Sequence, residues 1–213
     1  MKLIDMTVTD FASEVDSNSP APGGGSVSAL ASDIGVGLAR MMAHLSFGKK
    51  KFEALDDKTK EEFKVRFDKL GEIRTELSTL VDKDTESFNE FMKALKLPKE
   101  TDEEKVARAK AMEEATIFSI EVPYKTAKLS LEALKLLDFL VANGNQNAIT
   151  DIGVGTLMIA TGMEGAILNV KVNLMGLENK EIHDKYSKGC KEILCEGQKI
   201  KDDIIAKIHK QLD

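Results

Sequence analysis

The chain has 213 residues and a formal net charge of −6, and a domain of this length buries a sizeable core without help from metals or disulfides. Lysines are interleaved with aspartate and glutamate, and only 5% of the residues are aromatic, with no tryptophan. Because nucleic-acid binding needs a basic face or stacking aromatic side chains, this composition argues against a nucleic-acid partner.

The N-terminal third predicts two helices around a glycine-rich loop. Thr7 and Asp10 predict a capped helix that breaks at Asn18-Ser-Pro. The loop SPAPGGGSVS, residues 19–28, comes next. A second helix should then end near Gly48, where Lys49, Lys50 and Lys51 favour the C-terminal end of its dipole. Its predicted buried face comprises Val27, Leu30, Ala31, Ile34, Leu38, Met41, Met42 and Leu45.

Two long helices are predicted in the middle of the chain. The first runs from about Asp57 to Leu97, where Pro98 stops it, and its apolar spacing alternates four and three as in an antiparallel bundle. The second runs from Asp102, whose side chain can cap it, to Val141, with Pro123 bending it. Gly144 suits a left-handed cap at its end.

The last third of the chain predicts a central helix and an amphipathic one. Residues 149–177 are apolar nearly all round, with Gly153, Gly155, Gly162 and Gly165 among the apolar side chains. Asp151, Glu164 and Lys171 would be costly in lipid, so we expect a buried helix and no membrane association. An amphipathic helix over about 180–212 follows. The sequence therefore predicts a single-domain, all-α helical bundle over residues 1–213, in which the glycines admit close helix neighbours.

The glycine-rich loop is a candidate ligand site. It lacks the lysine of a Walker motif and the preceding strand of a dinucleotide fingerprint, so a phosphate cradle is not indicated. Backbone N–H groups at a helix N-terminus suit the carbonyls or carboxylate of a flat polar ligand. The alternative is that the glycines only allow two helices or two subunits to approach.

Aspartates at apolar positions are the candidates for chemistry. Asp84 lies on the seam of the long helix, where an unpaired charge costs several kcal/mol, so it should be paired or face a cavity. Asp151 opens the buried helix as a cap or a functional carboxylate. Asp82 falls on the opposite face, and Asn169 and Asn173 lie one turn apart. No His or Cys pair has metal-ligand spacing, so no metal is expected.

Five motifs in order resemble one known family. They are SPAPGGGSVSAL, GKKKFE, LVDKDTESFNEFMKALKLPK, EVPYKTA, and GNQNAITDIGVG followed by AILNVKVNL. The chain thus resembles the cyclodeaminase/cyclohydrolase family along nearly its whole length. That family is all-α, dimerises through helices and acts on one-carbon units carried between N5 and N10 of tetrahydrofolate. The resemblance implies a homodimer, a tetrahydrofolate substrate that can be polyglutamylated, and no further cofactor.

The resemblance also gives roles to residues of the matched motifs. Asp84 and Asp151 become the acid/base carboxylates, with Asp82 a third candidate. Lys49, Lys50 and Lys51 suit the glutamate tail, since its carboxylates need cations. The substrate-binding candidates are Pro22, Gly23, Gly24, Gly25, Ser26, Asn145, Asn169 and Asn173.

Three functions remain open on the sequence. Methenyltetrahydrofolate cyclohydrolase is favoured, and formimidoyltetrahydrofolate cyclodeaminase is the alternative because both reactions pass through a tetrahedral carbon at the same place. A non-catalytic helical assembly protein is the third. Cys190 and Cys195 have no redox spacing, and the N-terminus shows no secretion signal, so we expect a cytoplasmic protein with reduced thiols.

Overall fold

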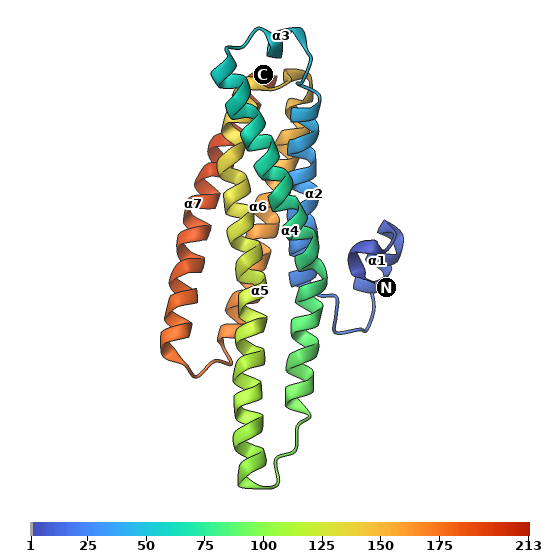
Figure 1. Cartoon of the computed structure of the whole chain (residues 1–213), viewed down its shortest axis with the longest axis vertical. Helices are drawn as coiled ribbons and strands as arrows, with labels where there is room; N and C mark the ends of the chain where they lie inside the picture. The colour runs from blue at the N-terminus through green and yellow to red at the C-terminus, as the bar shows by residue number, and fades with distance from the viewer. Residues whose placement is uncertain (1) are drawn as a thin grey trace.

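The structure is a bundle of five long helices. It is a computed structural model that describes residues 2–213, a range in which it contains no strand. The long helices run side by side, and the α4–α5 hairpin extends beyond the others at one end (Figure 1). Their bounds are α2 Gly24–His44, α4 Asp57–Leu95, α5 Asp102–Asn143, α6 Ile149–Leu174 and α7 Lys180–Leu212. The predicted all-α, single-domain fold is confirmed in its helical architecture.

Short elements complete the chain. The 3-10 helix η1 covers Leu3–Asp5, α1 covers Val8–Val15, α3 covers Lys50–Glu53 and η2 covers Gln146–Ala148. As predicted, Thr7 caps α1 by accepting a hydrogen bond from Asp10 N at 3.1 Å. Helix α1 buries no residue and stands apart from the bundle (Figure 1).

The predicted buried face of α2 is wrong in part, since Met42 is buried as predicted but most of the other assigned side chains are not. The structure instead buries the face made of small residues, including Ala29, Ser32, Gly35 and Ala39. Four of the side chains assigned to the core are exposed: Val27, Ile34, Met41 and Leu45. Periodicity alone gives weight to large apolar side chains, whereas a bundle with very close helices needs small ones at the contact.

Glycines allow α2 and α6 to pack closely, and the two helices run antiparallel. The sequence predicted that the glycines admit close helix neighbours, but not which helix or in which direction. A Cβ built on Gly35 would lie 2.7 Å from the carbonyl oxygen of Gly155, and one on Gly162 would lie 2.1 Å from Ser32 Oγ. Neither position has room for a side chain. Because the two helices are antiparallel, the first residues of α2 lie at the same end of the bundle as the last residues of α6.

Helix α6 is buried on only part of its surface, not all round. Val154, Leu157, Leu168 and Val172 are exposed, as is Glu164. The stretch Gln146–Leu174 is long and apolar enough to cross a membrane by length and composition, yet 56% of its most apolar window is buried inside the bundle. We interpret α6 as a core helix with one apolar face left uncovered.

Two predicted helix ends differ in detail. Thr101, not Asp102, caps α5, in a capping box with Glu104. Gly144 is extended, with φ −88°, so it is not a left-handed cap. Packing explains why a glycine stands at this position, because a Cβ there would lie 2.4 Å from Met42 Sδ.

Candidate functional site

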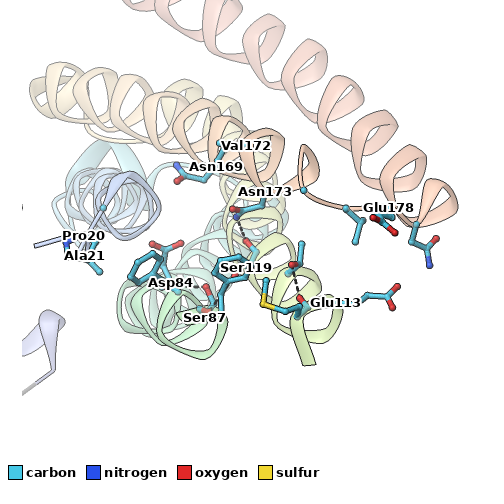
Figure 2. A pocket seen from close by; sticks show the side chains of 18 of the residues that line it. Pro20, Ala21, Asp84, Ser87, Glu113, Ser119, Asn169, Val172, Asn173 and Glu178 are labelled. Atoms are coloured by element: carbon cyan, nitrogen blue, oxygen red, sulfur yellow. Dashed lines mark hydrogen bonds between the residues drawn. The ribbon is translucent and has the colours of Figure 1, made fainter. Parts of the chain in front are cut away.

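A cavity of about 1160 Å³ opens at the end of the bundle where α2 begins and α6 ends. Its walls come from the loop before α2, from α4 and α5, and from the end of α6 with the turn that follows (Figure 2). Asp84, Asn169 and Asn173 approach it from two different helices. Its lining residues include Gly23, Gly24, Asp84, Ser87, Phe88, Phe91, Arg108, Lys110, Met112, Asn169 and Asn173.

Asp84 of α4 caps the N-terminus of α2. Ser26 N donates to Asp84 Oδ2 at 2.9 Å, and Ser26 Oγ lies 3.3 Å from the same oxygen. The first N–H groups of a helix lack partners within it, and Gly23, at the N-cap position, has no side chain to supply one. A carboxylate from another helix takes that place, where the helix dipole also favours negative charge.

Gly25 makes this contact possible. A Cβ on Gly25 would lie 2.0 Å from Asp84 Oδ1, so any side chain would collide with the carboxylate. Gly24 plays a milder part, since its Cβ would lie 3.1 Å from Asn169 Nδ2. The glycine-rich loop therefore receives the Asp84 carboxylate directly. It lets two helices approach, and its Gly23 and Gly24 line the cavity, whereas Pro22, Gly25 and Ser26 are not in the lining. Its role as a ligand site stays a prediction.

The environment of Asp84 favours proton exchange. Burial raises the pKa of its carboxyl group above the ordinary value, and the hydrogen bonds from Ser26 partly oppose this rise. Among the hydrogen bonds of residues 2–213, none reaches Asp84 Oδ1. A carboxylate that lines a cavity and has one oxygen without a hydrogen-bond partner can accept a proton from a bound molecule.

Two asparagine side chains of α6 face Asp84 across the cavity (Figure 2). Asn169 Nδ2 donates to the carbonyl of Gly165 at 2.9 Å. Asn173 Nδ2 donates to the carbonyl of Ser119 at 2.6 Å. These bonds fix both amides, so their oxygens are left to accept hydrogen bonds from a ligand.

The structure does not bring every predicted site residue to this cavity. Asp151 lies about 27 Å from Asn169 along α6, at about 1.5 Å per residue. Asn145 sits at that distant end too, where its Nδ2 donates to the carbonyl of Leu45 at 3.0 Å. Lys49, Lys50 and Lys51 follow Leu45 closely and share that end, exposed. Asp84 and Asp151 of one chain therefore cannot act on the same atom.

Asp82 and Pro22 lie outside the cavity lining and contact other parts of the chain. Asp82 Oδ1 accepts a hydrogen bond from Leu3 N at 2.6 Å, so this carboxylate anchors the N-terminal segment. Pro22 is buried and follows a cis peptide bond with Ala21. Their catalytic and substrate-binding roles stay predictions.

Sequence reasoning missed several cavity residues. Phe88 and Phe91 belong to the apolar pattern of the long helix that ends before Pro98, a pattern that predicts core positions, but both line the cavity. Arg108 and Lys110 of α5 were not singled out, although both lie at its rim. One feature of the sequence could have indicated them. They lie on α5, the helix that pairs in the hairpin with α4, which carries the LVDKDTESFNEF motif. Within residues 2–213 no three His, Cys, Asp or Glu side chains gather as metal ligands.

Fold and site together define an all-α bundle with a carboxylate-centred cavity for a small polar molecule. The family model for formiminotransferase-cyclodeaminase matches residues 7–192. The chain belongs to that family, as its motifs indicated.

Named relatives agree with this assignment. A methenyltetrahydrofolate cyclohydrolase of Methylorubrum extorquens is 31% identical over 97% of this chain and 98% of its own length. Formimidoyltransferase-cyclodeaminases of Mus musculus and Dictyostelium discoideum are 31% and 35% identical over 92% of this chain, but only 36% and 35% of their own lengths. All three are enzymes of folate one-carbon chemistry.

A solved structure confirms the fold. A formiminotetrahydrofolate cyclodeaminase from Thermotoga maritima matches with a TM-score of 0.83, covering 98% of both chains at 21% identity. The same arrangement of helices thus holds across a wide sequence distance.

Proposed function

We propose that this protein is a methenyltetrahydrofolate cyclohydrolase, converting 5,10-methenyltetrahydrofolate and water to 10-formyltetrahydrofolate. The observation that carries the proposal is Asp84, a partly buried carboxylate in the lining of the cavity, whose Oδ2 accepts a hydrogen bond from Ser26 N. The relative matched along 98% of its length is named for this reaction, which supports the choice.

The chemistry needs one proton acceptor beside a delocalised cation. The Asp84 carboxylate stabilises the amidinium of the substrate and takes a proton as water oxygen bonds to the bridging carbon. The carbon–N5 bond then breaks with its electron pair remaining on N5, and N5 takes the proton back from Asp84. The added hydroxyl loses its proton as the formyl C=O forms, so one proton is released overall. These steps involve no oxidation or reduction, so we propose that no cofactor is resident.

The second candidate is formimidoyltetrahydrofolate cyclodeaminase. The relative with 35% identity is named for a protein with that activity. In this reaction N10 attacks the formimino carbon on N5 and ammonia leaves. Asp84 would take the proton of N10, and the departing nitrogen needs an acid.

A spectrophotometric assay separates the two. Purified protein is mixed with 5,10-methenyltetrahydrofolate, and the decay of its absorbance is followed against buffer and the Asp84→Asn variant. A fast decay that the variant loses supports the cyclohydrolase. Absorbance that instead grows from 5-formiminotetrahydrofolate with ammonia release assigns the cyclodeaminase, and no reaction in either assay refutes both.

We further propose that the chain is a homodimer. The uncovered apolar face joins neighbouring helices α2 and α6, and its side chains are between 38% and 60% exposed. A face of this kind, the α2/α6 face, is unusual on a monomer and suits a second copy. Its members are Val27, Ile34, Met41, Leu45, Val154, Leu157, Leu168 and Val172.

Light scattering coupled to size exclusion tests the dimer. Ile34→Glu should halve the mass of the wild-type particle by placing a charge in the interface, whereas Val65→Glu, an exposed site on α4, should not. A monomeric wild type contradicts the proposal.

The free thiols Cys190 and Cys195 suit a reducing compartment, so we propose that the protein is located in the cytoplasm.

A further inference from the structure

The cavity changes chemical character along its length. At the α2 end it carries Asp84 with the amides of Asn169 and Asn173. One and two turns further along α4 come Phe88 and Phe91, with Met112 on α5 also in the lining. At the far rim, on the hairpin that extends beyond the bundle, stand Arg108 and Lys110.

Arg108 is held in a defined position with donors to spare. Its Nε and Nη2 donate to the carbonyl of Leu95, at 3.3 and 3.2 Å, at the C-terminus of α4. A guanidinium has five N–H donors, so three remain, and its planar fork matches a carboxylate. Lys110 is more exposed and makes only a long, 3.9 Å contact with Glu114.

The length of the cavity fits one defined part of a folate. Asp84 and Leu95 lie about 16 Å apart along α4, at about 1.5 Å per residue. In a folate, one benzoyl ring and one peptide-like link separate N10 from the glutamate carboxylates by on the order of 10 Å. A hydrogen-bond distance of about 3 Å at each end then closes the span.

We propose that Arg108, with Lys110 beside it, is the subsite for the glutamate tail, and that Phe88, Phe91 and Met112 hold the p-aminobenzoyl ring. The substrate then lies along α4 with its reacting carbon at Asp84. This inference rests on the proposed folate function. It moves the tail from Lys49, Lys50 and Lys51, which one chain keeps at the opposite end of the bundle.

The acidic residues at the rim limit where the tail can lie. Glu113 and Glu178 line the same cavity and lie together on one side of it (Figure 2). Their charges repel carboxylates, so within the cavity the tail needs the Arg108 guanidinium to hold it. A γ-linked chain of further glutamates would continue past Lys110 into solvent.

The test removes the glutamate from the ligand and the charge from the subsite. Calorimetry under anaerobic conditions compares tetrahydrofolate with tetrahydropteroate, which has no glutamate, in wild type and Arg108→Met. Lys105→Met is the matched control, because it loses the same charge on the same helix at an exposed site outside the cavity. A variant with Lys49, Lys50 and Lys51 all changed to methionine tests the opposite end.

Wild type should bind tetrahydrofolate at least about tenfold more tightly than tetrahydropteroate, the worth of a charge-assisted hydrogen bond. Arg108→Met should remove that difference without weakening tetrahydropteroate binding, and should raise KM for methenyltetrahydrofolate without lowering kcat. Lys105→Met should change nothing.

Three results overturn the inference. They are an equal loss for both ligands in Arg108→Met, no loss at all, or a glutamate-specific loss in the triple lysine variant instead, which would place a partner subunit's lysines at the cavity. The proposed function fails differently, by a wild type that turns over no folate in either spectrophotometric assay.

Discussion

Replacing Gly25 by alanine should slow catalysis about 100-fold while leaving the fold largely intact. The new Cβ would lie 2.0 Å from Asp84 Oδ1, about 1.4 Å short of ordinary van der Waals contact at 3.4 Å. The carboxylate must therefore move by more than 1 Å or turn away from Ser26. A displacement of about 1 Å at a reacting group costs on the order of 100-fold in rate, so kcat for methenyltetrahydrofolate should fall by about that factor.

The effect on stability should be smaller. Losing the Ser26 N–H bond to a carboxylate costs about 1.5–3 kcal/mol, and alanine in place of glycine in a helix returns about 1 kcal/mol. The net cost of about 0.5–2 kcal/mol should lower Tm by about 2–4 °C for each kcal/mol in a chain of this length. Thermal unfolding followed by circular dichroism measures it.

Gly37→Ala is the matched control on the same helix. Its Cβ would meet only Arg74 Nε, at 3.8 Å, so it should keep full activity and gain stability. The double variant Gly25→Ala/Asp84→Gly should cost less stability than the two single changes added together, because Gly25→Ala then has no carboxylate to displace. Wild-type kcat in Gly25→Ala, or strictly additive stabilities, would refute the reasoning.

Three further outcomes follow from the same contacts. Asp84→Asn should lose activity yet be more stable than wild type at neutral pH. Burial raises the pKa of Asp84 above 3.8, so the folded state keeps a proton that the unfolded state releases, and wild-type stability falls as pH rises between those two values. Urea unfolding from pH 3 to pH 8 checks this, and a constant difference between the two proteins would contradict it. Gly35→Val should destabilise by at least about 1–3 kcal/mol, since even its Cβ would meet the Gly155 carbonyl oxygen at 2.7 Å; unchanged urea unfolding would contradict the close helix contact. Arg74→Met should cost about 1–3 kcal/mol by leaving the buried Asp33 without its 3.3 Å partner, and Asp33→Asn in the same background should recover most of it.

The sequence predicted the helices well and their orientation less well. Apolar spacing located all five long helices, because their core positions repeat at three and four. It failed in part on α2, where the buried face is made mostly of glycine, alanine and serine. Small residues carry little weight in any hydrophobic pattern, yet they decide which face meets α6 at the closest contact in the bundle.

Polar residues on apolar seams were the sharper signal for the site. Asp84 interrupts the seam of α4, and a carboxylate largely withdrawn from water requires a partner, which the structure supplies in the N-terminus of α2. Asp151 met the same criterion as a polar residue opening an apolar helix but lies at the other end of α6. Periodicity tells which face a residue occupies, whereas the end of the bundle it reaches depends on how the helices are connected.

The connection between Asp84 and α2 joins stability to function in one contact. The carboxylate satisfies a backbone N–H that the glycine N-cap cannot satisfy, so its position is fixed by the start of a core helix and not by other catalytic side chains. Ser26 also ties this point to α4, since its Oγ donates to the carbonyl of Val81 at 2.8 Å. A base held in this way needs no second carboxylate to orient it. For this reason the loss of Asp151 from the site does not weaken the proposed chemistry, which asks for one proton acceptor at one carbon.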